Sequence, residues 1–491
     1  PGSQPRSRLP TPRSDPIDSI RMRLLLASLL TIAFASWCAS LVQTSAGRVQ
    51  LNSVRIPTQN GQWVVADLFK PRSVTAETPA PFIVVVPGFQ RSKEALSNIA
   101  LELGRRGCVT ASIDPNAQGA ARASLSRRAA TTEGYGMFAL VDYAASSENL
   151  NYIDRSRIGA TGHSAGGNAA IRGANYFGKQ ALQSGQPSKL HSVYVSGYVL
   201  TLTDEVLEDV RSNVGVAYAL YDEGAYRNEL GHGDMRVAPE ALRAVNSGLA
   251  PDAVVDRVEL GRHYGDMDQR TLRVVHNERI LHPFQPYMAE ATANQIAYFE
   301  KVFDFPSGLS PYDQIWAWKE LLGVVALIAA LVAVVPAGKL LLQTAWFNGL
   351  VTPIPDSLPA PKGMGRVVFW TVFTIGALLA CFTYIPMAEL SQKWFVAAST
   401  RQLTWFFPQR MNNAVMLWAV LNGTVGFLMF WLSYRFFGSK HGVSPDMWGV
   451  RTSPAQLLRT LSLAAVLFVS YFLFLFTVYY FFHVDYRFLF M

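Results

Sequence analysis

The chain has 491 residues, of which half are hydrophobic and 16% are charged. This length exceeds one ordinary domain, and so large an apolar share is unusual for a wholly water-soluble protein. The formal net charge is +8, but no long basic run with interleaved aromatic residues occurs, which argues against nucleic acid as a partner. We therefore expect membrane-spanning segments beside a folded domain.

The N-terminal segment, residues 1–23, is rich in Pro, Ser and Arg and has no apolar periodicity, so we expect it to be disordered. Met22 within it is a candidate for the natural start. Residues 24–43 form an uncharged apolar stretch long enough to cross a bilayer. This stretch is either a retained signal anchor with a cytoplasmic N-terminus or a signal peptide cleaved near Thr44-Ser45-Ala46. Its length favours the anchor, and under both interpretations the domain after it is exported.

Residues 47–305 have the composition of an α/β domain. The first two expected strands, residues 49–57 and 62–70, alternate in polarity like a hairpin. Pro81–Val86 is a continuous apolar run, as expected for a strand buried on both faces. Further strands are expected at residues 108–113, 157–160, 191–196, 214–221 and 271–275, and helices at residues 92–106, 135–145, 165–176 and 289–302. This alternation predicts a mainly parallel, doubly wound sheet.

The C-terminal region, residues 316–491, contains four more apolar stretches of membrane-spanning length, which predict an all-α transmembrane bundle. The stretches are residues 321–342, 367–387, 414–434 and 461–482. With an outward first helix, the loops after the second and fourth of the five spans are cytoplasmic and carry more Lys and Arg than the exported loop, which holds Lys393, Arg401 and Arg410. We expect a multi-pass integral membrane protein whose α/β domain is extracytoplasmic. A natural continuation past Met491 stays open.

The strongest motif is Gly162-His163-Ser164-Ala165-Gly166, which matches G-x-S-x-G. It follows an expected strand and opens an expected helix. A nucleophilic serine needs that placement, because a sharp strand-to-helix turn exposes its hydroxyl and the helix N-terminus directs N–H groups at a developing oxyanion. The alternative is a glycine-rich turn with an inert serine.

Residues 81–167 resemble the α/β-hydrolase superfamily of esterases and lipases. The strand Pro81–Val86 leads into Pro87-Gly88-Phe89-Gln90, where the family has its oxyanion loop, and Asp114–Gly119 resembles the Asp- and Gly-containing loop after the next strand. The resemblance implies an α/β-hydrolase fold over residues 47–305, with Ser164 as nucleophile. It also implies that the N–H groups of Ala165 and of Phe89 or Gln90 bind the oxyanion. Many members have His-Gly where this chain has Pro87-Gly88; backbone donors do not need that histidine, although Pro87 itself cannot donate.

The family's chain order is serine, acid, histidine. Asp222, at the end of the strand expected at residues 214–221, is the expected acid; Glu223 is the alternative, and a simple turn or cap carboxylate is the non-catalytic interpretation. His282 follows the last expected strand and precedes the last helix, which is where the base is expected. His276 is its competitor, and His232 and His263 also satisfy the order.

No Cys-x-x-Cys, His-Glu-x-x-His or phosphate-loop pattern occurs in the sequence, so we expect neither a metal nor a cofactor. The three cysteines do not suggest a disulfide framework. The expected function is a membrane-bound serine hydrolase that cleaves an ester, thioester or amide carbonyl of a small-molecule or lipid-like acyl substrate. Two alternatives stay open: an acyltransferase on the same fold, and a non-catalytic membrane module that uses the hydrolase fold for binding.

Overall fold

The computed structural model describes residues 16–487, except 59–60, 62, 125, 306, 355–356, 359, 401, 403, 408 and 449–451. Its described residues form two compact units. The first contains Leu41–Ala317 and Thr371–Leu428, and the second contains residues 16–40, Trp318–Trp370 and 429–487.

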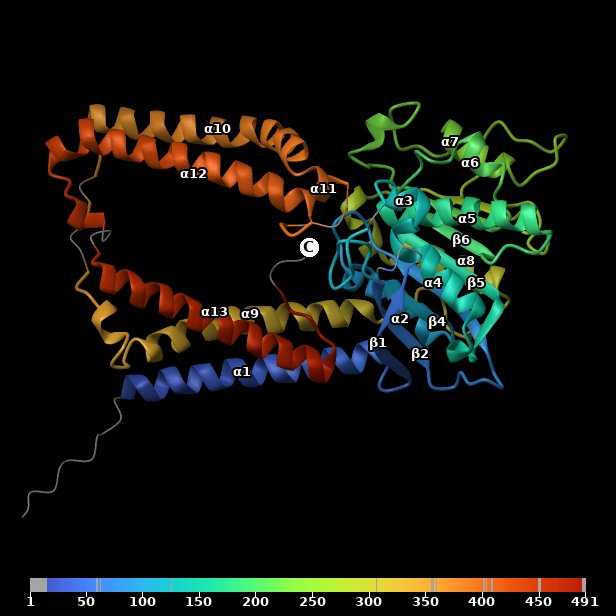
Figure 1. The fold of residues 1–491 in the computed structure, drawn as a ribbon, viewed down its shortest axis with the longest axis horizontal. Coiled ribbons are helices and arrows are strands. Elements are labelled where there is room, and N and C mark those ends of the chain that lie inside the picture. The colour runs from blue at the N-terminus through green and yellow to red at the C-terminus, as the bar shows by residue number, and fades with distance from the viewer. Residues whose placement is uncertain are drawn as a thin grey trace, which may run out of the picture. The chain divides into compact units, whose positions relative to one another are not determined.

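A nine-stranded sheet forms the centre of the first unit, in the strand order β1-β2-β4-β3-β5-β6-β7-β9-β8. Figure 1 shows this sheet with helices packed beside it. The strands are β1 (Val49–Pro57), β2 (Trp63–Pro71), β3 (Ala80–Val86), β4 (Val109–Ile113), β5 (Ile153–His163), β6 (Ser192–Ser196), β7 (Asn213–Ala217), β8 (His263–Tyr264) and β9 (Arg273–His276). The six strands from β4 to β9 in this order pair in parallel, while β1, β2 and β8 join antiparallel at the two edges. The predicted mainly parallel sheet is confirmed.

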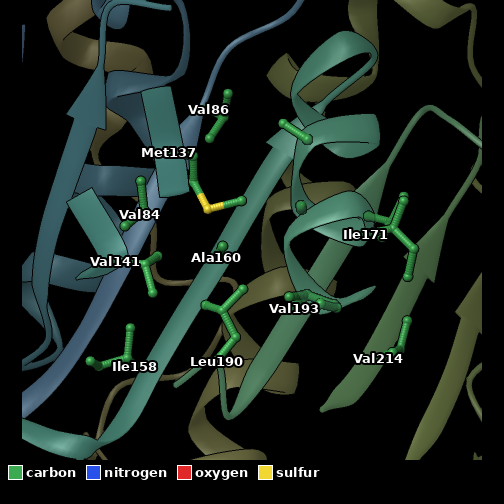
Figure 2. Packing of buried hydrophobic residues seen from close by; sticks show 14 of the residues in the cluster. Val84, Val86, Met137, Val141, Ile158, Ala160, Ile171, Leu190, Val193 and Val214 are labelled. Atoms are coloured by element: carbon green, nitrogen blue, oxygen red, sulfur yellow. The ribbon is translucent and has the colours of Figure 1, made fainter. Parts of the chain in front are cut away.

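Helices cover both faces of this sheet. Those that pack on it are α2 (Ser97–Arg105), α4 (Met137–Ser146), α5 (Ala165–Ser184) and α8 (Ala289–Val302), and the shorter ones are α3 (Ala129–Thr132), α6 (Asp204–Leu207) and α7 (Pro239–Asn246). Val84 and Val86 of β3 belong to the apolar cluster under α4 and α5, which Figure 2 shows from close by. Ile83 and Val85 belong to the cluster under α2 and α8. Burial on both faces explains why β3 is apolar without alternation.

Several elements differ from their expected bounds, among them one strand and two helices near the serine motif. The strand expected at residues 214–221 ends at Ala217, because the chain then turns: the Asp222 N–H donates to the Ala219 carbonyl, and the Leu220 N–H donates to the Glu278 carbonyl. The helix expected at residues 165–176 continues to Ser184, where Gly185 takes a φ of 66° and ends it. The helix expected at residues 92–106 is a 3-10 turn, Lys93–Leu96, followed by α2.

Five helices of the described residues are long and apolar enough to cross a membrane, judged by length and composition. They are α1 (Pro16–Gln43), α9 (Trp316–Leu341), α10 (Met364–Trp394), α12 (Arg410–Phe436) and α13 (Pro454–Phe482), and the short helix α11 (Val396–Ser399) lies between α10 and α12. In the second unit, α1, α9 and α13 share an apolar cluster around Ile32, Ala330 and Leu475. In the first unit, α10 and α12 are joined where Trp418 Nε1 donates to the Ala380 carbonyl at 2.9 Å.

The first helix begins at Pro16, before the expected span of residues 24–43. Residues 16–23, expected to be disordered, are therefore helical, and an ion pair of 3.1 Å between Arg21 and Asp18 lies in the first turns. Residues 1–15 of the expected disordered segment lie outside the described residues.

A buried carboxylate, Glu102 of α2, caps the start of α9. Its Oε1 accepts hydrogen bonds from the N–H groups of Ile315 and Trp316 at 2.7 and 3.0 Å. Its Oε2 accepts from the Nη1 atoms of Arg105 and Arg106 at 2.7 and 2.9 Å. The first N–H groups of a helix have no intrahelical partner, so this carboxylate satisfies donors that an apolar helix cannot satisfy itself.

Replacing this carboxylate tests the cap. We expect Glu102→Gln to lower the free energy of unfolding by about 3 kcal/mol, because it leaves two arginines at a buried site without their shared charge partner. Thermal unfolding of the full chain in detergent measures this, with the exposed Glu148→Gln as the matched control. Equal midpoints for the two variants would contradict the role of Glu102.

Candidate active site

Ser164 lies on a sharp turn between β5 and α5. Its φ is 57° and its ψ is −117°, a left-handed conformation that costs a non-glycine residue on the order of 1–3 kcal/mol. Two backbone hydrogen bonds hold the turn: the Ser164 N–H donates to the Ser196 carbonyl at 2.8 Å, and the Asn168 N–H donates to the Ser164 carbonyl at 3.0 Å. The strand-turn-helix placement predicted for this motif is confirmed.

The glycines of the motif are required by close backbone contacts. A Cβ atom on Gly166 would lie 1.8 Å from the Val86 carbonyl oxygen, and one on Gly162 would lie 2.4 Å from the Gly166 carbonyl carbon. A Cβ atom on Gly167 would lie 2.7 Å from the Ser196 carbonyl oxygen. The backbone of α5 thus starts in direct contact with the ends of β3 and β5, where only glycine fits.

The loop after β3 lies against this serine. A Cβ atom on Gly88 would lie 3.3 Å from the Cβ atom of Ser164. The next residue, Phe89, lines two cavities together with Ser164, and Gln90 is buried with a φ of 56°. Ala165 is the first residue of α5, a position whose N–H has no partner within the helix. Of the three residues expected to form an oxyanion hole, Ala165 adjoins the serine and Phe89 lines its cavities, while Gln90 follows Phe89 in the same loop and lines neither cavity.

Asp222 and His282 form a hydrogen bond of 2.8 Å between Oδ2 and Nδ1. Burial acts to raise the pKa of Asp222, but the hydrogen bond and charge of His282 and the Gly224 N–H outweigh it, so this pKa lies below its ordinary value. An ionised carboxylate only accepts hydrogen bonds, so the proton in this bond is on Nδ1 of His282. His282 and Ser164 both line the same two cavities.

The competing residues occupy other positions. The Glu223 carboxylate accepts a hydrogen bond from the backbone N–H of His282 at 3.3 Å, and not from its imidazole. His276 ends β9 with its Nδ1 atom 3.0 Å from the Tyr194 hydroxyl, and burial, followed by the charge of His263, lowers its pKa to about 4. His276 is not among the residues that line the two cavities of Ser164.

His163 is a site residue for which the sequence pattern assigned no role. Its buried ring lies 4.5 Å, centre to centre, from the ring of His282. Burial, followed by the charge of His282, lowers its pKa to about 3, although Asp222 acts in the opposite direction. Its only signal in the sequence is its place beside the serine. At neutral pH the site therefore has an uncharged imidazole next to His282.

The larger of the two cavities has a volume of about 310 Å³ and the smaller about 230 Å³. Beside Ser164, Asp222 and His282, the larger one is lined by two cationic side chains, Arg227 and Arg410, which the sequence did not single out for this site. Within the part of the chain that the structure describes, no three His, Cys, Asp or Glu side chains are grouped so as to hold a metal ion.

Comparisons with known proteins give one family match and a set of similar solved structures. Residues 36–222 match a family described as PETase, PET hydrolase-like. No curated protein matches the chain. Similar solved structures include an esterase of Pyrococcus furiosus, with 12% identity over 53% of this chain and 95% of that chain, at a TM-score of 0.37. A second is a Pyrobaculum calidifontis esterase, with 16% identity, 60% and 94% coverage and a TM-score of 0.34. A third is brefeldin A esterase, described as a bacterial homologue of human hormone-sensitive lipase, with 13% identity, 57% and 86% coverage and a TM-score of 0.36.

The family match, the mainly parallel sheet and the serine turn together support an α/β-hydrolase fold. They also support a hydrolase of the esterase type at the level of the superfamily.

The backbone contact at the serine turn generates a test. We expect Gly166→Ala to lower the free energy of unfolding by at least about 2 kcal/mol, because a Cβ atom there overlaps the Val86 carbonyl. Gly423→Ala in α12 is the control, since no atom lies within 4 Å of its added Cβ and alanine favours a helix. Unfolding midpoints in detergent compare the two, and a Gly166→Ala protein as stable as the control would contradict the contact.

Proposed function

We propose that the protein is a membrane-bound serine hydrolase that cleaves an ester, thioester or amide carbonyl through an acyl-enzyme on Ser164. The observation that carries this proposal is the Asp222–His282 hydrogen bond. Both residues line a cavity that Ser164 also lines, and Ser164 lies on a strained turn. A turn or cap carboxylate does not need an imidazole partner, and an inert serine does not need a left-handed backbone. The family description, PET hydrolase-like, supports hydrolysis.

In the proposed reaction, His282 Nε2 takes the hydroxyl proton as Ser164 Oγ attacks the carbonyl carbon. Asp222 holds the imidazole and stabilises its charged form. The N–H groups of Ala165 and of Phe89 or Gln90 donate to the tetrahedral oxyanion, each contributing on the order of 3 kcal/mol of transition-state stabilisation. When the tetrahedral intermediate collapses to the acyl-enzyme, the alcohol, thiol or amine leaves with the proton from His282. Water then attacks the acyl-enzyme by the same steps, and the carboxylic acid is released.

His163 fits this reaction as a neutral neighbour. The imidazolium that forms on His282 is destabilised by any positive charge nearby, and a protonated histidine with its ring centre at 4.5 Å would supply one. Because burial lowers the pKa of His163 to about 3, its ring stays uncharged while His282 gains its proton.

We further propose that the chain is a multi-pass membrane protein whose hydrolase domain is extracytoplasmic, with α1 as a signal anchor. The lengths and hydropathies of the five apolar helices support this arrangement. After the hydrolase domain, α9 and α10 are two crossings, so the chain returns to the side of that domain before α12. The parallel bridge between Ser124 and Gln402, both in the first unit, is consistent with such a return.

A fluorophosphonate probe tests the nucleophile. We expect the full chain in detergent to be labelled and Ser164→Ala to be unlabelled, since only an activated hydroxyl attacks the probe. Ser184→Ala, at the exposed end of the same helix, is the matched control and should label like the native protein. A folded native protein that does not react with the probe would favour a non-catalytic binding module.

Product analysis with an added alcohol separates hydrolysis from acyl transfer. Hydrolysis gives the free acid, whereas acyl transfer gives the ester of the added alcohol.

The identity of the acid is tested by neighbouring substitutions. We expect Asp222→Asn to lower kcat by about 10³–10⁴-fold on a nitrophenyl ester, because an amide at this position no longer fixes the imidazole tautomer. Glu223→Gln changes a side chain that accepts only the backbone N–H of His282, so its kcat should fall far less. The reverse order of effects would assign the acid to Glu223.

A further inference from the structure

The larger cavity beside Ser164 carries an excess of positive charge. Arg227 and Arg410 line it, while Asp222 is the one carboxylate among its described lining residues and is hydrogen-bonded to His282. Among the described residues, no carboxylate oxygen lies within ion-pair distance of either guanidinium group, whereas Arg236 and Arg243 of the same domain each pair with an acid. The described lining therefore has two guanidinium groups against one carboxylate, which is an excess of one positive charge.

Arg227 is placed by the same loop that carries the proposed acid. It ends a short 3-10 helix, Ala225–Arg227, and its Nε donates to the Gly224 carbonyl at 3.2 Å. Burial raises the pKa of Tyr198 and of Tyr218, two other residues that line the cavity, and the charge of Arg227 opposes both shifts. The positive charge of Arg227 therefore acts on the two tyrosine hydroxyl groups, while its Nε atom is held by the backbone.

Arg410 reaches the cavity from a distant part of the sequence. It is the first residue of α12 and belongs to the same compact unit as Ser164. With the Gln90 amide oriented to satisfy its neighbours, its side-chain oxygen accepts hydrogen bonds from the N–H groups of Arg410 and Met411, at 3.3 and 3.0 Å. Gln90 is buried in the loop expected to bind the oxyanion. The start of α12 is therefore tied to that loop.

We propose that Arg227 and Arg410 form an anion subsite, and that the substrate is an ester carrying a carboxylate or phosphate near its scissile carbonyl. This inference rests on the proposed function and narrows it to a substrate class. Guanidinium groups present planar pairs of donors that match carboxylate and phosphate oxygens, so two of them beside one nucleophile favour an anionic substrate.

Two matched pairs of substrates test the subsite in the full-length protein in detergent. The first pair, 4-nitrophenyl hexanoate and the mono-4-nitrophenyl ester of adipic acid, differs by a carboxylate on the acyl side. The second pair, 1-hexanoylglycerol and its 3-phosphate, differs by a phosphate on the alcohol side. We expect the native protein to show a higher kcat/KM for the anionic member of one pair, and that pair identifies where the anion lies.

The arginine variants supply the decisive comparison. In the responding pair, we expect Arg410→Gln and Arg227→Gln each to lower the anionic-to-neutral ratio of kcat/KM about tenfold or more, the loss expected for a charge-assisted hydrogen bond. Arg410→Lys and Arg227→Lys keep the charge and should retain part of the preference. Arg262→Gln is the control, because Arg262 is exposed, pairs with Glu259 and lies outside the cavity lining.

A ratio unchanged in both glutamine variants would overturn the anion subsite, as would a native preference for the neutral ester in both pairs. Hydrolysis of neutral esters alone, or fluorophosphonate labelling of Ser164 without hydrolysis of either anionic ester, refutes the subsite and leaves the nucleophile in place. Failure to hydrolyse any of the four esters, together with absence of labelling, refutes the proposed function itself.

Discussion

The geometry of the site depends on one backbone contact, between the start of α5 and the end of β3. A Cβ atom on Gly166 would lie 1.8 Å from the Val86 carbonyl oxygen, so the helix is packed against the strand as closely as a peptide chain allows. The chain passes from β5 into this helix within one residue, which places Ser164 at a φ of 57°. Fully buried parallel strands on either side supply the packing that sustains this strain.

The elements around that contact were predictable because their signals are local. The apolar run of β3 and the small residues of the serine turn each dictate their own backbone, and so does the G-x-S-x-G spacing. The end of β7 was not predictable, because the turn after Ala217 is held by backbone bonds to residues around Glu278, which is distant in sequence. The sequence could not predict that Arg410 lines this site, because two apolar helices separate it from the α/β domain. Hydrophobic periodicity does not indicate which loop between helices packs against another domain.

Two apolar helices begin with the same solution to one physical problem. The first N–H groups of α9 and α12 need acceptors that neither helix contains. Glu102 supplies them to Ile315 and Trp316, and Gln90 supplies them to Arg410 and Met411. Both acceptors are buried side chains of the α/β domain. Gln90 directly follows Phe89, which lines the cavity of Ser164. The cap of α12 and the loop beside Ser164 therefore belong to the same chain segment.

This connection bears on the weak charge asymmetry of the sequence. Lys and Arg are normally retained on the cytoplasmic side of a membrane, yet the region from the end of α10 to the start of α12 carries Lys393, Arg401 and Arg410. In the proposed topology that segment is exported, so its positive charge opposes the usual bias. The proposed anion subsite accounts for a positive charge there, because Arg410 lines the cavity of Ser164. Under the two proposals together, membrane orientation disfavours a positive charge at position 410, whereas substrate binding requires one.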